Sequence, residues 1–185
     1  MAEAGRPRVS RRNSRMIRGR GYDGLMSPPE CRPAAASATT LQRLMLPEHA
    51  NQLGAVHGGE VMKAADEAGA ICAMRHTRRP CVTVCVDSME FHSPVRVGQL
   101  LRCQARVTWT GRTSIEVRVQ VEAEDVIAGQ MTLTNSAYIV YVALDDAGKP
   151  TEVTPLAVVS AEDERLWQGA ADRQRDRLLG RRRDG

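Results

Sequence analysis

The chain has 185 residues, a length typical of one domain with a sizeable hydrophobic core. Its 26 Lys and Arg residues outnumber its 22 Asp and Glu residues, but the excess lies at the ends: residues 1–40 hold 8 basic and 3 acidic groups, whereas residues 41–159 hold 11 and 13. A folded nucleic-acid surface needs clustered positive charge, so we expect no nucleic-acid partner. The longest apolar run, residues 137–144, is too short to span a membrane, and no segment has the residue order of a secretory signal.

The five cysteines are odd in number and lie mostly inside apolar patterns. We therefore expect free, buried thiols in a reducing, cytoplasmic compartment rather than a disulfide framework. Cys81 and Cys85 are expected to face the same way on a strand, but a zinc site needs closer pairs and further ligands. We expect no metal site.

Residues 1–40 are expected to form a disordered basic tail, because Arg, Gly, Pro, Ser and Ala occur there without a helix or strand period. An Arg-rich, acid-poor start is also typical of an organellar transit peptide, or of a segment that binds polyanions loosely. A third interpretation is that translation starts later, at Met16, Met26 or Met45. We favour a dispensable tail.

Signals of regular structure begin at residue 41, and the folded domain is expected over 41–159. The predicted elements are a short strand over 41–46, a loop, a helix over 59–76, and four strands over 81–91, 100–109, 115–122 and 131–144. Apolar and polar residues alternate along the two middle strands of these four, as in antiparallel strands with one wet face. One helix must then be covered by one curved antiparallel sheet, an α+β arrangement.

Residues 160–185 predict a C-terminal helix, over 160–179, followed by a basic tail. Ser160 and Asp163 predict a capping box at its start. A thin apolar stripe can dock the helix: Leu166, Trp167 and Ala170. We interpret it as a solvated helix rather than a dedicated binding element.

The start of the 59–76 helix is unusual, because residues 55–58 include no Ser, Thr, Asp or Asn to cap it. Gly58 and Gly59 also remove the side chains that would keep another molecule away. An uncapped, glycine-lined helix start can bind a developing negative charge, whether a phosphate or a carbonyl oxyanion. Glycine pairs also form tight turns, so this pattern alone does not define a site.

Asp66 is the one carboxylate on a helical stripe of apolar or small residues: Met62, Gly69 and Ala73. Such a carboxylate is either a structural hydrogen-bond acceptor or a catalytic base, whereas Glu67 is expected in solvent or in a salt bridge. Gly69 costs about 1 kcal/mol of helix propensity relative to Ala, so we expect another group to approach it closely.

The distance between these two features has a consequence for any active site. Asp66 lies roughly 10–12 Å along the helix axis from Gly58 and Gly59, whereas a base must come within about 3 Å of the group it serves. Asp66 could reach a carbonyl held at the glycine pair if two such helices ran antiparallel across a two-fold axis. An active site built from these residues should therefore be shared between subunits.

The segment PEHANQLGAVHGGEVMKAADEAGA (47–70) resembles the signature of the hotdog-fold acyl-CoA thioesterases. The branch is the one that contains bacterial acyl-CoA hydrolases and the two-domain cytosolic acyl-CoA hydrolase of animals. TVCVDSMEFHSPVRVG, GRTSIEVRVQVEAE and YIVYVALDDAGKPTEVTPL are similar to the same branch, so the resemblance covers residues 41–165. It implies a long central helix wrapped by an antiparallel sheet, homodimers whose sheets join edge to edge, and often hexamers, as trimers of dimers.

The resemblance also implies an active site at the dimer interface, with Asn51 from the loop of one subunit and Asp66 from the helix of the other. The ordinary interpretation of Asn51 is a loop residue or an Asx-turn. His57 precedes the glycine pair, where some family members have an aromatic residue, so we expect it to be structural rather than the base.

The implied reaction is hydrolysis of fatty acyl-CoA to a free fatty acid and CoA, with no cofactor beyond the CoA of the substrate. Amides around Gly58 and Gly59, beside His57, would hold the oxyanion, and Asp66 would activate a water or attack directly. In the hairpin, Arg112 with Thr113 and Ser114 is the first candidate for the CoA phosphates, although a hairpin Arg is often only solvated.

Two other functional classes stay open. A hotdog enoyl-CoA hydratase or dehydratase would use a His with an acid, and His57 and Asp66 are available. A non-catalytic acyl-CoA sensor of the transcription-regulator kind needs a helix-turn-helix, which residues 1–40 are too rich in Gly and Pro to form. The preferred acyl chain length depends on the depth of the substrate tunnel, which is set by how side chains of two subunits meet.

Overall fold

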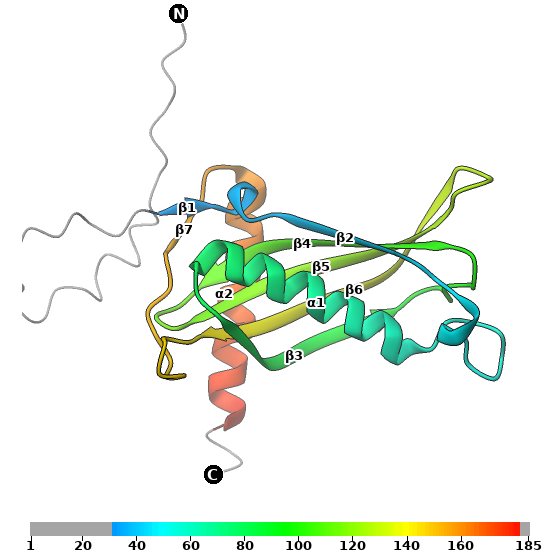
Figure 1. Ribbon diagram of the computed structural model, residues 1–185. Coiled ribbons are helices and arrows are strands. Elements are labelled where there is room, and N and C mark those ends of the chain that lie inside the picture. Colours follow the sequence, from blue (N-terminus) through cyan, green and yellow to red (C-terminus); the bar gives the residue numbers. More distant parts are fainter. Residues whose placement is uncertain (1–30, 182–185) are drawn as a thin grey trace, which may run out of the picture.

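A five-stranded antiparallel sheet, in the order β2-β4-β5-β6-β3, forms the frame of the protein (Figure 1). Its strands are β2 (Thr39–Leu44), β3 (Cys81–Phe91), β4 (Leu100–Thr110), β5 (Ser114–Asp125) and β6 (Gln130–Ala143). Helix α1 (Gly58–Thr77) lies in front of the sheet in Figure 1, and α2 (Ala161–Arg181) lies behind it. The computed structural model describes residues 31–181. The predicted helix on a curved antiparallel sheet, with a C-terminal helix, is confirmed.

The core forms where α1 lies on the sheet. Along β4 and β5 the alternating apolar residues pair across the ladder and face the helix, for example Ala105 with Val119 and Val107 with Val117. The helix meets them with small residues that are fully buried: Ala64, Ala65, Ala68 and Cys72. These short side chains let the helix axis approach the sheet closely. Neither described helix is long and apolar enough to cross a membrane.

The N-terminal segment is tied to the chain after β6. Strand β1 (Arg32–Pro33) pairs in parallel with β7 (Leu156–Ala157), and a short 3₁₀ helix over Ala34–Ala36 leads into β2. Regular structure therefore begins before residue 41, ahead of the predicted boundary, because two-residue strands and single turns have no periodicity to detect. The rest of the predicted tail, residues 1–30, lies outside the described residues.

A buried histidine joins this segment to the end of α1. His76 is fully buried; its Nδ1 lies 3.1 Å from Ser37 Oγ, and its Nε2 lies 3.2 Å from the Thr154 carbonyl oxygen. The His76 carbonyl accepts a hydrogen bond from the Arg32 guanidinium. Burial, together with the charge of Arg32, lowers the pKa of His76 from 6.5 to about 4, although the Thr154 contact alone would raise it. The imidazole is therefore neutral in the folded protein near pH 7.

We expect the stability of the protein to fall as the pH is lowered from about 6.5 towards 4. The unfolded chain binds a proton on His76 near pH 6.5 but the folded chain only near pH 4, so the contribution is complete above this window and is lost within it. The size of the effect is about 3 kcal/mol. Urea unfolding at several pH values measures it, and His76→Gln should flatten the pH dependence in this window. An equally steep dependence in that variant would contradict the assignment.

Helix α2 covers part of the sheet face that the sequence predicts to be wet. Glu116 of β5 is fully buried there and accepts hydrogen bonds from Thr108 Oγ1 at 2.8 Å and Arg173 Nη2 at 2.7 Å. Arg177 also pairs with Glu116, and with Asp87 of β3. The prediction of a merely solvated helix is therefore wrong for this face: α2 carries two arginines that neutralise a buried carboxylate.

The start of α2 follows the sequence prediction more closely. The Asp163 amide donates to Ser160 Oγ at 3.1 Å, and Ser160 Oγ donates to the Asp163 carboxylate at 2.9 Å, so the predicted capping pair is present. Arg106 of β4 donates to the same carboxylate at 2.5 Å. Trp167 and Ala170 are buried, as their place on the apolar stripe predicts.

Candidate active site

The start of α1 is capped by a histidine. His57 is the N-cap residue, and its Nδ1 accepts a hydrogen bond from the Gly59 amide at 3.1 Å. The prediction of an uncapped helix start is therefore wrong, because an unprotonated imidazole nitrogen accepts the amide proton that a Ser or Asp oxygen usually takes. Within residues 31–181 the Gly58 amide has no hydrogen-bond partner, so Gly58 rather than Gly59 offers the amide that is open to a ligand.

Gly58 lies beside the end of the edge strand β3. A Cβ added to Gly58 would lie 3.4 Å from Cε1 of Phe91, a side chain that is 53% exposed in the single chain. The open amide therefore sits next to an exposed aromatic ring. This combination suits a ligand with a polar carbonyl and an apolar chain.

Asn51 forms an Asx-turn in the loop before α1. Its side-chain oxygen accepts from the Leu53 amide at 2.8 Å and from the Ala55 amide at 3.3 Å. Its own amide donates to the Ala55 carbonyl at 2.7 Å. The structure thus shows the Asx-turn that the sequence allowed, and the side-chain NH₂ group has no partner in the described part of the chain.

Asp66 is half-buried on the face of α1 that lies over β3 and β6. Thr83 Oγ1 of β3 donates to Asp66 Oδ1 at 2.7 Å, and the Tyr141 hydroxyl of β6 lies 3.3 Å from the same oxygen. Among the described residues Oδ2 has no hydrogen-bond partner. One carboxylate oxygen is therefore held and the other is available to a water molecule.

Gly69 provides the room for this arrangement. A Cβ at Gly69 would lie 2.2 Å from the Tyr141 hydroxyl oxygen, so only a glycine lets the tyrosine ring approach the helix here. The close approach expected from the sequence is confirmed, and its partner is Tyr141.

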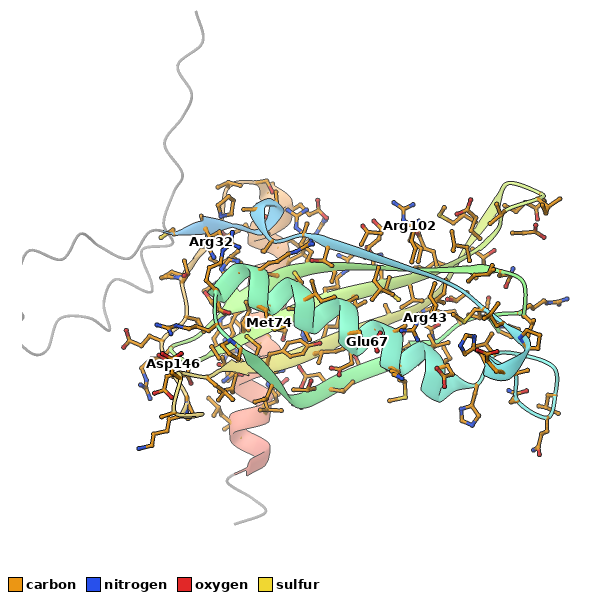
Figure 2. All side chains as sticks on the ribbon, viewed as in Figure 1. Arg32, Arg43, Glu67, Met74, Arg102 and Asp146 are labelled. Atoms are coloured by element: carbon orange, nitrogen blue, oxygen red, sulfur yellow. The ribbon has the colours of Figure 1, made fainter. Side chains whose placement is uncertain are left out.

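Glu67, the neighbouring carboxylate, points away from this group. It pairs with Arg43 of β2 at 2.5 Å, and Figure 2 shows the two side chains side by side. Arg43 also lies 4.0 Å from Glu60. The salt bridge that the sequence allowed for Glu67 is present, and it leaves Asp66 as the one acidic group over β3 and β6 in this part of the helix.

The predicted CoA-binding residues lie at the hairpin between β4 and β5. Arg112 is exposed, whereas Thr113 and Ser114 line a cavity of about 260 Å³ with Gln174 and Arg177 of α2. This cavity lies on the α2 side of the sheet, and Asp66 lies on the α1 side. The single chain therefore does not bring the hairpin and Asp66 together.

A β-bulge separates the two cysteines of β3. The register of β3 with β6 shifts between Thr83 and Cys85, which inserts Val84 as an extra residue. Cys81 Sγ consequently lies 3.3 Å from Thr77 Oγ1 of α1, while Cys85 Sγ donates to Asp87 on the other face. The prediction that they face the same way is wrong.

Four cysteines are free thiols: Cys72, Cys81, Cys85 and Cys103. Burial raises the pKa of Cys72 and of Cys103 to about 12, so both behave as small apolar groups. Residues 31–181 contain no cluster of three or more potential metal ligands.

One helix wrapped by a curved antiparallel sheet, with an acidic residue midway along the helix, places the chain in the hotdog class. Residues 53–129 match the thioesterase superfamily. The chain is 34% identical to protein VdlD of Helicobacter pylori, over 77% of this chain and 81% of that protein. It is 32% identical to the uncharacterized acyl-CoA thioester hydrolase YkhA of Bacillus subtilis, over 85% of this chain and 91% of that protein. The chain belongs to the thioesterase superfamily.

Solved structures agree with this assignment. A hexameric acyl-CoA thioesterase, in its apo form, shares 37% identity with a TM-score of 0.78, covering 81% of this chain and 96% of that one. The acyl-CoA hydrolase of Staphylococcus aureus, in complex with butyryl-CoA, CoA and CoA disulfide, shares 30% identity with a TM-score of 0.77, covering 84% and 94%. The predicted hotdog fold is confirmed.

The Staphylococcus aureus hydrolase also has structures of three alanine variants. They replace an asparagine, an aspartate fifteen positions later and a threonine seventeen positions after that. Asn51, Asp66 and Thr83 have the same spacing in this chain. Sequence reasoning missed Thr83; the one available signal was a hydroxyl within the otherwise apolar run CVTVCV.

Proposed function

We propose that this protein is an acyl-CoA thioesterase that hydrolyses fatty acyl-CoA to a free fatty acid and CoA. The observation that carries the proposal is the carboxylate of Asp66, half-buried, fixed through Oδ1 by Thr83 and open at Oδ2. The names of the relatives and structural neighbours, acyl-CoA thioester hydrolases and acyl-CoA thioesterases, support it.

The chemistry follows from these groups. Asp66 Oδ2 takes a proton from a water molecule, whose oxygen attacks the thioester carbonyl carbon. The carbonyl oxygen becomes an oxyanion, which the open Gly58 amide at the positive end of α1 stabilises. His57 fixes the geometry of that helix start through its bond to Gly59. When the tetrahedral intermediate collapses, the carbon–sulfur bond breaks and CoA leaves as a thiolate. The thiolate takes up the proton that Asp66 accepted from the water, which restores the carboxylate.

Such a site needs two protomers, because Gly58 and Asp66 lie two turns apart on one helix. We propose a homodimer in which β3 pairs with β3 of its partner, so that the two α1 helices run antiparallel and each Asp66 approaches the other chain's helix start. In the single chain β3 is an edge strand that exposes apolar side chains: Val82, Val84, Val86 and Phe91. Three such dimers would form a hexamer, the state named for several structural neighbours.

The remaining contacts are also proposals. The side-chain NH₂ of Asn51 would orient the water or the carbonyl. Arg112, with Thr113 and Ser114, would contact the CoA phosphates, since its exposed guanidinium has no acidic partner within residues 31–181. We propose a cytosolic location, as in the name of the Mus musculus relative, which is 37% identical over 68% of this chain and 35% of its own length.

Release of free CoA from acyl-CoA substrates of increasing chain length, followed with a thiol reagent, tests the proposal. We expect hydrolysis of fatty acyl-CoA and no hydration of crotonyl-CoA. His57 is engaged as a helix cap, which argues against its use as the base of a hydratase. Hydration without thiol release would favour the hydratase, and tight acyl-CoA binding without turnover would favour the sensor.

A further inference from the structure

We infer that Tyr141 is a positioning residue for Asp66: its hydroxyl and that of Thr83 together fix Oδ1 of the carboxylate and leave Oδ2 to the attacking water. The inference rests on the proposed function and adds a residue to it. Tyr141 is fully buried on β6, 75 positions from Asp66 in the sequence, so its contact with the carboxylate depends on the folded sheet.

The two hydroxyls come from one rung of the sheet. Thr83 and Tyr141 are directly opposite each other in the antiparallel pairing of β3 and β6. Side chains of such a pair lie on the same face at about 5 Å. Asp66 lies over this pair of residues. Its Oδ1 accepts a hydrogen bond from Thr83 Oγ1 at 2.7 Å and lies 3.3 Å from the Tyr141 hydroxyl oxygen.

The Tyr141 hydroxyl has a second acceptor within reach, the main-chain oxygen of Asp66 at 3.0 Å. It has one proton to donate. The main-chain oxygen lies in the interior of α1, where it accepts the helical amide four residues later, whereas an ionised carboxylate is the stronger acceptor. The proton therefore goes to Oδ1 when Asp66 is charged.

Two further features keep this donor in place. Gly69 leaves the space that the hydroxyl occupies, since a Cβ there would lie 2.2 Å from the hydroxyl oxygen. Burial, and next the charge of Asp66, raise the pKa of Tyr141 far above its usual value, so the phenol stays protonated throughout the working pH range. Towards an ionised carboxylate, a protonated hydroxyl acts only as a donor.

The test compares two tyrosines of the same strand. Tyr141→Phe removes the hydroxyl and keeps the ring; we expect kcat for acyl-CoA hydrolysis to fall about 10-fold, with KM changed less than about 2-fold. Tyr138→Phe is the matched control, because Tyr138 faces α2, where Arg173 lies 3.6 Å above its ring, and the ring remains. We expect wild-type kcat and KM for this control. A loss confined to KM, or equal losses in both variants, would overturn the inference.

Two more variants separate positioning from folding. In Gly69→Ala the Tyr141 hydroxyl remains, but the added methyl group displaces it from Asp66 Oδ1. We expect kcat to fall at unchanged KM. This variant tests the inference even if Tyr141→Phe does not fold. A double-mutant cycle compares Thr83→Val, Tyr141→Phe and the double variant. If both hydroxyls bind the same carboxylate oxygen, the loss of kcat in the double variant should differ from the product of the two single losses. A loss equal to that product would overturn the inference. Thermal unfolding and oligomer size are measured for each variant.

The outcomes distinguish this inference from the proposed function. An inactive wild type would contradict the function itself, and full turnover in Asp66→Asn would contradict the assigned base. An active wild type and an inactive Asp66→Asn, together with wild-type turnover in Tyr141→Phe, would overturn the role of Tyr141 alone.

Discussion

Replacing Asp66 by asparagine or alanine is expected to leave a folded oligomer that hardly hydrolyses acyl-CoA. Asparagine has nearly the same shape and still offers Oδ1 to Thr83, but it cannot take a proton from water. General-base catalysis contributes about 10²–10⁴-fold, so we expect a loss of kcat in that range. Steady-state thioester hydrolysis measures it, with the unfolding midpoint and oligomer size as checks of the fold.

The neighbouring residue supplies the control. Glu67→Gln removes the other carboxylate at this level of α1, which is paired with Arg43 rather than with the site. Partly exposed pairs of this kind contribute about 0–1 kcal/mol, so the Glu67 variant should be active and nearly as stable as the wild type. Near-normal turnover in Asp66→Asn, or an equal loss in Glu67→Gln, would contradict the assigned base.

Mixing two inactive variants should restore activity if the active site is shared. Asn51→Ala and Asp66→Ala damage opposite halves of the proposed site, so a mixed dimer contains one site with both residues intact and one with neither. Random exchange between equal amounts makes half of the dimers mixed, so about a quarter of the sites recover. Co-expression of two differently tagged chains, followed by the hydrolysis assay, measures this recovery.

The control for this experiment uses two lesions on the same half-site. Thr83 contacts Asp66 of its own chain, so mixing Thr83→Val with Asp66→Ala creates no site with both residues intact. We expect no more activity than the two parents contribute separately. No recovery in the first mixture would show that each site belongs to a single chain, and recovery in the second would show that Thr83 and Asp66 serve different sites.

The main elements could be predicted because they repeat a local pattern. The helix expected over 59–76 is observed as Gly58–Thr77, and the alternating strands appear with nearly the expected ends. The β-bulge at Val84 breaks this alternation, so the strict period of two assigned Cys85 to the wrong face. The face expected to be solvated holds the buried Glu116 for a related reason: periodicity shows which face a residue lies on but not what later covers it.

The active-site candidates were predictable only in part. Asp66 stands out as a carboxylate on an apolar helical stripe, and this feature is visible in the sequence. Its partners Thr83 and Tyr141 are distant in the sequence, and they meet it only because β3 and β6 pair in one register. The cap at Gly59 depends on the rotamer of His57, and no composition rule predicts a rotamer.

Because Thr83 belongs to an edge strand, the Asp66 carboxylate is supported by the part of the sheet that has a neighbour on one side only. In a separated protomer this strand is free to fray, whereas a partner strand would pair its outer edge. Diluting the protein until the protomers separate would therefore lower the turnover of each chain well before any chain unfolds, so that specific activity depends on protein concentration.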